Sequence, residues 1–208
     1  MNLSPITVLH LDWLPAVPED LVDIDLRVPS LDWAYRSSVS RSLIYHDVSV
    51  PVPDRSYTRY QISAELETWV RQNIAQTWKN IGYSCSIPPA NGPHFDSSGF
   101  WTLQYLLRSG GDDAALVFYE PLDESLELDP VPHKFYFSDY RKLRVIERHV
   151  LPERQWYLFN GLEIHSCENI QQDRIALQIR FMRNPLRSGS IRNLNNDDLK
   201  ILDHARDI

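Results

Sequence analysis

Two tripeptides in the sequence place a histidine and an aspartate two residues apart. HFD occupies positions 94–96 in the loop-rich run PPANGPHFDSSG, and HLD occupies positions 10–12 in the run ITVLHLDWL. On an extended chain, residues two apart point to the same side, so each pair can present an imidazole and a carboxylate to one metal ion. Such matches are common by chance, and the first run can equally form a polar turn. A metal site therefore needs further ligands elsewhere in the chain.

A third ligand and a cation follow the HFD tripeptide in chain order. His165 comes after the apolar run WYLFN and a glycine, and Arg174 opens the strand-like run RIALQIRF. Two histidines and one carboxylate are the ligand set of non-haem iron(II) oxygenases, which leave other coordination positions open. A fixed cation beside that set suits an anionic co-substrate. The candidate metal ligands are therefore His94, Asp96 and His165.

The remaining histidines and the second cysteine have simpler interpretations. No comparable basic strand follows HLD 10–12, so we interpret that tripeptide as part of a strand with two polar side chains. His133 and His149 are isolated in strand-like runs, which is typical of packed or surface histidines. Cys167 lies two residues from His165, where redox sensitivity is one interpretation and a small buried side chain is the one we favour.

The elements that must position these residues are mostly strands. Short aromatic and β-branched runs separated by turn signals predict an antiparallel sandwich or barrel. These runs are 100–107, 114–120, 134–139, 143–151, 155–160 and 174–181. Apolar residues at spacings of three and four, from Ile62 to Trp78, predict a helix over residues 61–80 that stops near Gly82. The tail predicts one short helix within residues 195–208.

The last predicted strand alternates between two kinds of side chain. Arg174, Gln178 and Arg180 share one face with Ala176, and the opposite face is apolar. In a barrel whose mouth holds a ligand, a polar inner face is expected. A polar face exposed to solvent on the outside fits the pattern equally well. The run WTLQYLL offers the same choice for Thr102 and Gln104, and the pattern alone does not decide it.

Composition limits the class of protein. The chain has 208 residues, of which 43% are hydrophobic, and this suits one globular domain with a sizeable core. The net charge of −7 argues against nucleic-acid and anionic-membrane partners, because both favour a basic surface. Two cysteines exclude a disulfide scaffold and a zinc ribbon. The sequence contains no signal-peptide pattern, and we expect a cytoplasmic protein.

HFD 94–96, His165 and Arg174 together resemble the 2-oxoglutarate- and iron(II)-dependent oxygenases. The run WYLFNGLEIHSCENIQQDRIALQIRF is similar to the closing strands of the aspartyl/asparaginyl β-hydroxylase-like branch, and FWTLQYLLRSGGDDAALVFYEP is similar to its middle strands. The resemblance covers about residues 90–182. It implies a mainly β fold with flanking helices, built on a double-stranded β-helix or cupin-like jelly roll.

The resemblance also implies an organisation and a set of roles. A single domain spans 1–208, with flanking strands and a helix in 1–89, the jelly-roll core in 90–182 and a tail in 183–208. His94, Asp96 and His165 would hold Fe(II), and Arg174 would pair with the distal carboxylate of 2-oxoglutarate. From strand facing, Gln104 and Ser166 would add hydrogen bonds to that co-substrate.

The implied activity is hydroxylation of an unactivated C–H bond, with O2 as oxidant and 2-oxoglutarate converted to succinate and CO2. The substrate would be a small molecule, for example an amino acid, or a peptide side chain. Two alternatives stay open: a cupin-type metalloenzyme that does not use 2-oxoglutarate, and a non-catalytic jelly-roll binding module. Residues 121–142 match nothing in the family, so the substrate is not determined, and neither is the oligomeric state.

Overall fold

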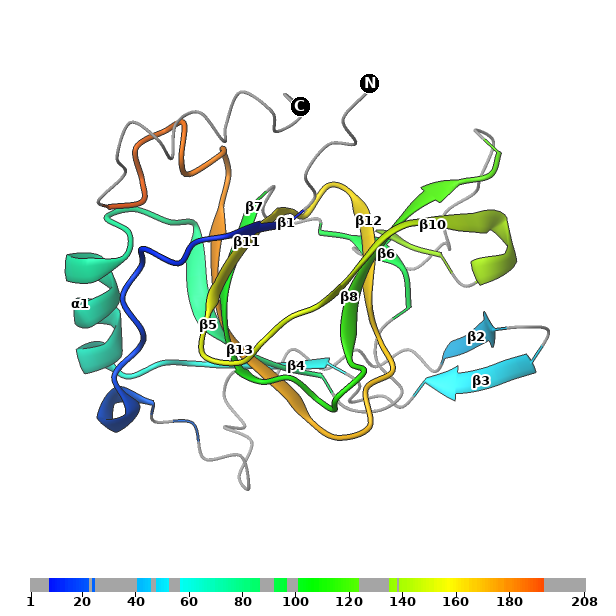
Figure 1. Cartoon of the computed structure of the whole chain (residues 1–208), viewed down its shortest axis with the longest axis horizontal. Helices are drawn as coiled ribbons and strands as arrows, with labels where there is room; N and C mark the ends of the chain where they lie inside the picture. The colour runs from blue at the N-terminus through cyan, green and yellow to red at the C-terminus, as the bar shows by residue number, and fades with distance from the viewer. Residues whose placement is uncertain are drawn as a thin grey trace.

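The protein is built around two antiparallel β-sheets that face each other, and the expected mainly β, jelly-roll class is confirmed (Figure 1). The computed structural model describes residues 8–22, 24, 41–45, 48–52, 57–86, 92–96, 101–123, 135–137 and 139–192. Within these residues, no helix is long and apolar enough to cross a membrane.

The larger sheet has six strands and the smaller has five. In spatial order, the larger contains β1 (Val8–His10), β11 (Trp156–Asn160), β7 (Trp101–Arg108), β13 (Arg174–Phe181), β5 (Asn80–Ser86) and β4 (Tyr57–Tyr60). The smaller contains β10 (Leu143–Val150), β8 (Ala115–Pro121), β12 (Ile164–Glu168), β6 (His94–Phe95) and β9 (Phe135–Tyr136). A separate hairpin consists of β2 (Arg41–Tyr45) and β3 (Val48–Val52). Short 3-10 turns occur at Glu19–Leu21 and Tyr140–Lys142.

The connectivity is that of a jelly roll. From β5 to β8 the chain crosses from one sheet to the other at every step, and it does so again from β10 to β13. Consecutive strands therefore lie in opposite sheets, and strands distant in sequence become neighbours. This connectivity places β6 beside β12 and β13 beside β7, although the two strands of each pair are separated by a long stretch of chain.

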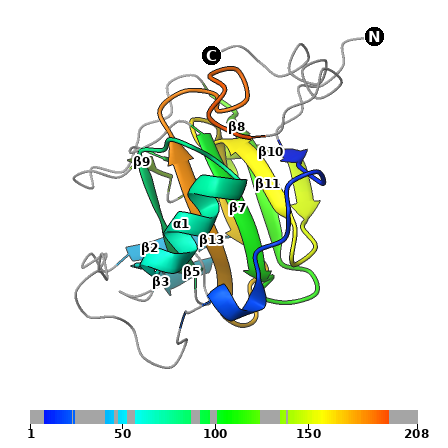
Figure 2. The same ribbon diagram turned by 90° about the vertical axis from the view of Figure 1, so that its left-hand side faces the viewer.

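The single described α-helix covers the outside of the larger sheet (Figure 2). Helix α1 (Ala64–Asn73) begins at Ser63, whose hydroxyl accepts a hydrogen bond from the Leu66 amide at 3.1 Å. Its buried residues Leu66 and Val70 belong to the same apolar cluster as Leu177 of β13. The helix thus shields the outer face of the sheet from water.

The helix is shorter than the sequence predicts. The prediction of 61–80 was wrong at its C-terminal end, because strand pairing replaces helix there. The Lys79 amide donates to the Arg180 carbonyl at 2.8 Å, and β5 then pairs with β13 along its full length. Gly82 is not a helix stop but a strand residue. A Cβ at that position would lie 2.7 Å from the Tyr60 carbonyl oxygen, so β4 can approach β5 only at a glycine.

The predicted strands and the observed ones agree within a few residues where alternation was strong. Each of the six predicted runs contains one observed strand, namely β7, β8, β9, β10, β11 and β13. Strands β5 and β12 were not predicted. Strand β5 lies before residue 90 and pairs with β13, and the predicted division of the chain at residue 90 stays a prediction. The predicted helix within 195–208 and most of the unassigned segment 121–142 lie outside the described residues.

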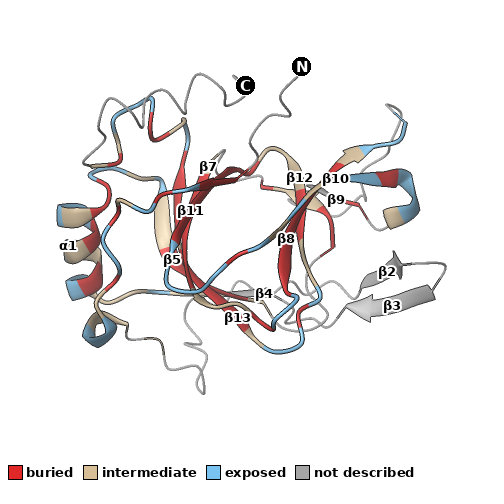
Figure 3. Cartoon of the chain, viewed as in Figure 1, coloured by how far each residue is buried: buried red, intermediate tan, exposed pale blue. Residues whose placement is uncertain are grey.

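The packing decides which face of β13 points inward. Leu177 and Ile179 pack in the outer cluster beneath α1, whereas Ala176 packs with Leu106 and Phe118 in a second cluster between the sheets. The polar residues that share the face of Ala176 therefore line the interior. Figure 3 shows how thoroughly the facing strands β7, β8, β11 and β13 are buried. The alternative of a solvent-exposed polar face is excluded.

Candidate metal centre

Strand pairing brings the two candidate histidines together. His94 on β6 is the register partner of His165 on β12, and their ring centroids are 4.6 Å apart. Asp96 lies two residues beyond His94. One ligand atom from each of these three residues lies within 4.8 Å of the others. Among the described residues, this is the one such group of histidine, cysteine and carboxylate side chains.

The backbone fixes which nitrogen of each imidazole faces the group. His94 Nδ1 lies 2.8 Å from the Gly92 carbonyl oxygen, and His165 Nδ1 lies 2.8 Å from the Glu163 carbonyl oxygen. A carbonyl can only accept a hydrogen bond, so Nδ1 carries the proton in both rings. The lone pair is then on Nε2, the atom available to a metal. Backbone support of this kind is typical of metal-ligating histidines.

The charges of the three side chains also suit a cation. Burial, followed by the proximity of His165, lowers the pKa of His94 to about 3. Burial also lowers the pKa of His165. For Asp96, burial alone would raise the pKa, but Arg180 and the two histidines outweigh it, and the pKa lies below its usual value. Two neutral imidazoles and one carboxylate are the protonation states that bind metal.

Asp96 is held on several sides. Its Oδ1 lies 3.2 Å from Nη2 of Arg180, and its Oδ2 accepts a hydrogen bond of 3.2 Å from the Thr102 hydroxyl. Its amide donates to the Gly161 carbonyl at 2.6 Å. A Cβ at Gly161 would lie 2.8 Å from Oδ2, so only glycine permits this close approach. The carboxylate therefore has little freedom to turn.

Aromatic rings pack beside His165 and form one side of the site. The ring centroids of Phe159 and Phe118 lie 5.3 Å and 6.0 Å from the His165 centroid. Both phenylalanines are buried in the cluster between the sheets. This apolar contact restricts the imidazole to one orientation and keeps water away from one side of the group.

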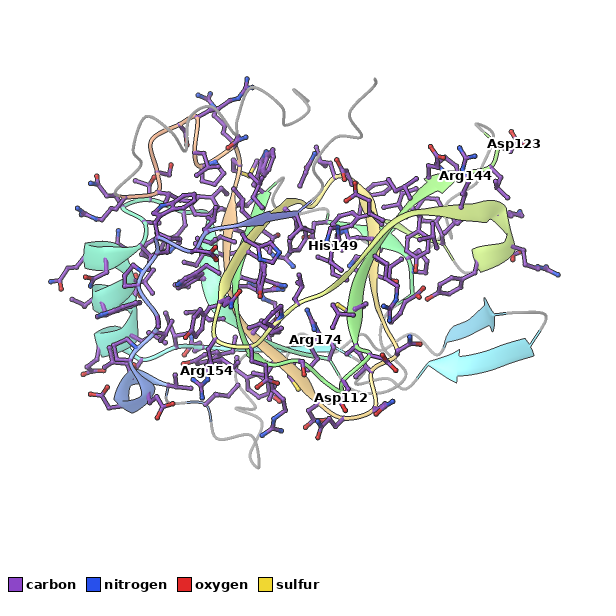
Figure 4. All side chains as sticks on the ribbon, in the orientation of Figure 1. Asp112, Asp123, Arg144, His149, Arg154 and Arg174 are labelled. Atoms are coloured by element: carbon purple, nitrogen blue, oxygen red, sulfur yellow. The ribbon has the colours of Figure 1, made fainter. Side chains whose placement is uncertain are left out.

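A second set of polar side chains lies between the sheets. Arg174 is buried, and Figure 4 shows it in the space between the two sheets. Its Nη1 donates to the Ser109 carbonyl at 2.9 Å, whereas its buried Nη2 has no hydrogen-bond partner among the described residues. The same holds for Nε2 of Gln104, which is also buried. Unpaired buried donors are costly, so these atoms are available to a group that accepts hydrogen bonds.

The comparisons with known proteins are limited to the fold. No protein-family model matches the sequence, and no curated protein matches it either. One matching solved structure is the X-ray structure of E. coli ycfD, with 11% sequence identity and a TM-score of 0.36. The alignment covers 87% of this chain and 60% of that one, so this chain spans well under two thirds of that protein. Similarity at this level assigns no activity.

The structure does not bring every predicted residue to the site. Ser166 lies on the opposite face of β12 from His165, and its hydroxyl is 2.7 Å from the Tyr119 hydroxyl. Gln104 does face the interior, on β7. In the HLD tripeptide, Leu11 is buried in the core, His10 packs edge-on against Tyr157 at 4.8 Å and Asp12 is exposed.

Among the described residues, His149 and Cys167 take no part in the group. His149 packs against the edge of the Phe118 ring and lies 2.9 Å from a Glu147 oxygen. Cys167 is partly buried against the cluster between the sheets. His133 lies outside the described residues, so its interpretation stays a prediction.

Three neighbours of Asp96 were not assigned to the site from the sequence. Arg180 and Thr102 were recognised as members of polar faces, and that alternation was the available signal. Their contact with Asp96 depends on how the two sheets face each other, which no local pattern encodes. Gly161 was seen only as a turn residue.

Proposed function

We propose that this protein is an Fe(II)- and 2-oxoglutarate-dependent oxygenase. It would hydroxylate an unactivated C–H bond of a small molecule, for example an amino acid, or of a peptide side chain. The observation that carries the proposal is the convergence of His94, Asp96 and His165, with both imidazoles presenting Nε2. The donor set of two nitrogens and one oxygen fits Fe(II) and leaves other coordination positions open.

When bound, iron supplies the activation of O2 that couples C–H hydroxylation to conversion of 2-oxoglutarate into succinate and CO2. The protein's own residues would orient and protect the reactants. His94, Asp96 and His165 would hold the iron, and Phe118 and Phe159 exclude water beside His165. Exclusion of water protects a reactive centre from side reactions.

Arg174 would hold the far carboxylate of 2-oxoglutarate, and Gln104 would add a hydrogen bond to the co-substrate. Both have buried donor atoms without partners among the described residues. Arg174 begins β13, just after the turn that follows Glu168 at the end of β12. In this arrangement one carboxylate of 2-oxoglutarate would lie at the metal group and the other at the guanidinium. Leu106 and Ala176, which lie between the two ends, suit its methylene groups.

Some side chains between the two sheets are partly exposed to solvent. Gln178 faces inward from β13, a strand that is paired on both sides with β5 and β7. Gln178 is nevertheless partly exposed, and so is Cys167 on the inner face of β12. Partial exposure on the inside of paired strands indicates that water, and hence a small co-substrate, can enter between the sheets.

The same features weigh against the alternatives. A cupin enzyme that does not use 2-oxoglutarate gives Arg174 no function, although its buried Nη2 would remain costly. A non-catalytic binding module gives no reason for three potential ligands to converge with their protonation states fixed. The acidic net charge of −7 favours a small-molecule or peptide substrate over a nucleic acid.

The decisive experiment is an anaerobic titration of the purified protein with Fe(II) and then with 2-oxoglutarate. Chelation of iron by the co-substrate should produce a weak visible charge-transfer band, and the His165→Ala variant should lack it. Formation of succinate from 2-oxoglutarate in air would provide a second readout. Absence of the band in the wild-type protein, although Fe(II) binds, would refute the 2-oxoglutarate assignment.

A further inference from the structure

We propose that Arg180 is a positioning residue for the metal site, acting together with Thr102. The two side chains would orient the Asp96 carboxylate so that one oxygen lone pair is available to a metal together with the two histidine nitrogens. This inference rests on the proposed metal site but not on the use of 2-oxoglutarate. Neither residue is required as a ligand.

The contacts occupy both oxygens of Asp96. Arg180 Nη2 lies 3.2 Å from Oδ1, and the Thr102 hydroxyl lies 3.2 Å from Oδ2. Arg180, Asp96 and Thr102 are all buried, so water does not compete strongly for these interactions. In such surroundings a charge-assisted contact is stronger than it would be at the surface.

The two positioning side chains come from the opposite sheet to the ligands. Arg180 on β13 and Thr102 on β7 are register partners in the six-stranded sheet. Asp96 follows β6, which belongs to the five-stranded sheet. The ion pair and the hydrogen bond therefore connect the two sheets at the metal group.

Asp96 needs this support more than the histidines do. Each histidine lies within a strand and has its Nδ1 fixed by a backbone carbonyl. Asp96 lies just past the end of β6, a strand of two residues, and its amide is held by the turn residue Gly161. A carboxylate has about four lone-pair directions in two oxygens, so its side chain must be oriented by its neighbours.

Occupying both oxygens also affects how many coordination positions remain. A carboxylate without such neighbours can bind a metal through both oxygens. With Arg180 on one oxygen and Thr102 on the other, binding through a single oxygen is favoured. One further position then stays open for a substrate or co-substrate.

An alternative role for Arg180 predicts the opposite result. If Arg180 were only a structural ion-pair partner, its main effect on a bound divalent cation would be Coulomb repulsion. Its removal would then strengthen metal binding. If Arg180 orients Asp96, its removal weakens metal binding, because outer-shell partners typically contribute about 10- to 100-fold in affinity. The sign of the change therefore distinguishes the two roles.

The test is Mn²⁺ binding measured by electron paramagnetic resonance, without 2-oxoglutarate. We expect Arg180→Met to weaken Mn²⁺ binding by about 10- to 100-fold. Thr102→Val, which changes no charge, should weaken it in the same direction by a smaller factor. Arg180→Lys should recover part of the loss. The matched control is Arg71→Met, which removes an arginine that pairs with Glu67 on α1, outside the site, and should leave Mn²⁺ binding unchanged.

A double-mutant cycle with Asp96→Ala tests whether Arg180 acts through Asp96. In that background, Arg180→Met should cause no further loss of Mn²⁺ affinity. Tighter or unchanged binding in Arg180→Met, or an equal loss with and without Asp96, would overturn the proposal. If Arg180→Met does not fold, Thr102→Val and Arg180→Lys decide the question by the same criterion. Failure of the wild-type protein to bind Mn²⁺ would instead refute the proposed function.

Discussion

Arg174 and Arg180 lie on the same inward face of β13, but their surroundings differ. They are six residues apart, or about 20 Å along the strand. Arg180 meets the carboxylate of Asp96, a residue of the protein itself. Arg174 donates to a backbone carbonyl and keeps a buried nitrogen without a partner among the described residues.

The difference indicates two uses of a buried cation. A guanidinium whose counter-ion belongs to the fold stabilises the arrangement of that fold. A guanidinium without a carboxylate in reach bears a desolvation cost that an anionic ligand can offset. In the proposed arrangement, Arg180 supports the metal group, whereas Arg174 would meet a ligand that arrives from solution.

The largest effect should follow removal of a metal ligand. We expect His165→Ala to weaken Mn²⁺ binding by more than about 100-fold, because even outer-shell partners contribute about 10- to 100-fold. Isothermal titration calorimetry or electron paramagnetic resonance would measure it. His149→Ala, which removes another histidine near Phe118, is the matched control and should bind Mn²⁺ normally. Similar binding by both variants would contradict the assigned ligand set.

The second effect separates the two arginines directly. Arg174→Met should raise the Kd for 2-oxoglutarate of the Mn²⁺-loaded protein by about 10- to 100-fold, since a hydrogen bond to a charged group contributes about 1.5–3 kcal/mol. Its Kd for Mn²⁺ alone should not change. Unaltered affinity for 2-oxoglutarate in this variant would show that Arg174 does not bind the co-substrate.

A smaller effect is expected from one added methyl group at the metal end. In Gly161→Ala, the new Cβ would lie 2.8 Å from Oδ2 of Asp96 and must displace the carboxylate. Mn²⁺ affinity should fall by about 10-fold, at the lower end of the outer-shell range. Far-ultraviolet circular dichroism should remain that of the wild type. Unchanged Mn²⁺ binding would mean that Asp96 can move without cost.

The smallest effect concerns the two cysteines. Cys85 lies on β5 of the larger sheet, and Cys167 lies on β12 of the smaller sheet. Burial, followed by the charge of Asp173, raises the pKa of Cys85 to about 11, so its thiol should resist alkylation at pH 8. Cys167, partly exposed on the inner face, should react slowly. Mass spectrometry after iodoacetamide treatment should therefore find one label in the native protein and two after denaturation. Modification of Cys85 should appear only as the pH approaches 11.

The sequence predicted the parts of the fold that local patterns determine. The runs around β7 and β13 alternate, the run around β8 is continuously apolar, and all three were predicted as strands. Strand β5, with its glycine and serines, carries little β signal and depends on pairing with β13. The helix was predicted too long, because residues 74–80 have helical spacing. In the structure α1 ends at Asn73 and β5 begins at Asn80.

The site was predictable in its ligands but not in its surroundings. The candidate ligands were predicted from residue types and from the order of HFD 94–96, His165 and Arg174 in the chain. Arg180 could not be connected with Asp96, because that contact depends on how two sheets face each other. Ser166 was assigned to the interior although it is one residue from His165. Alternation along β12, had that strand been recognised, would have placed it on the other face.

The pairing of β6 with β12 has a consequence for the folding of the chain. His94 and His165 are 71 positions apart in sequence, and they form the one register pair between these two strands. A metal held by both would act as a cross-link that closes a long loop, and closing such a loop removes conformational freedom from the unfolded chain. Metal binding would thus stabilise the fold as well as complete the proposed site. Hydrogen exchange of the amides in β6 should slow most when Mn²⁺ is added.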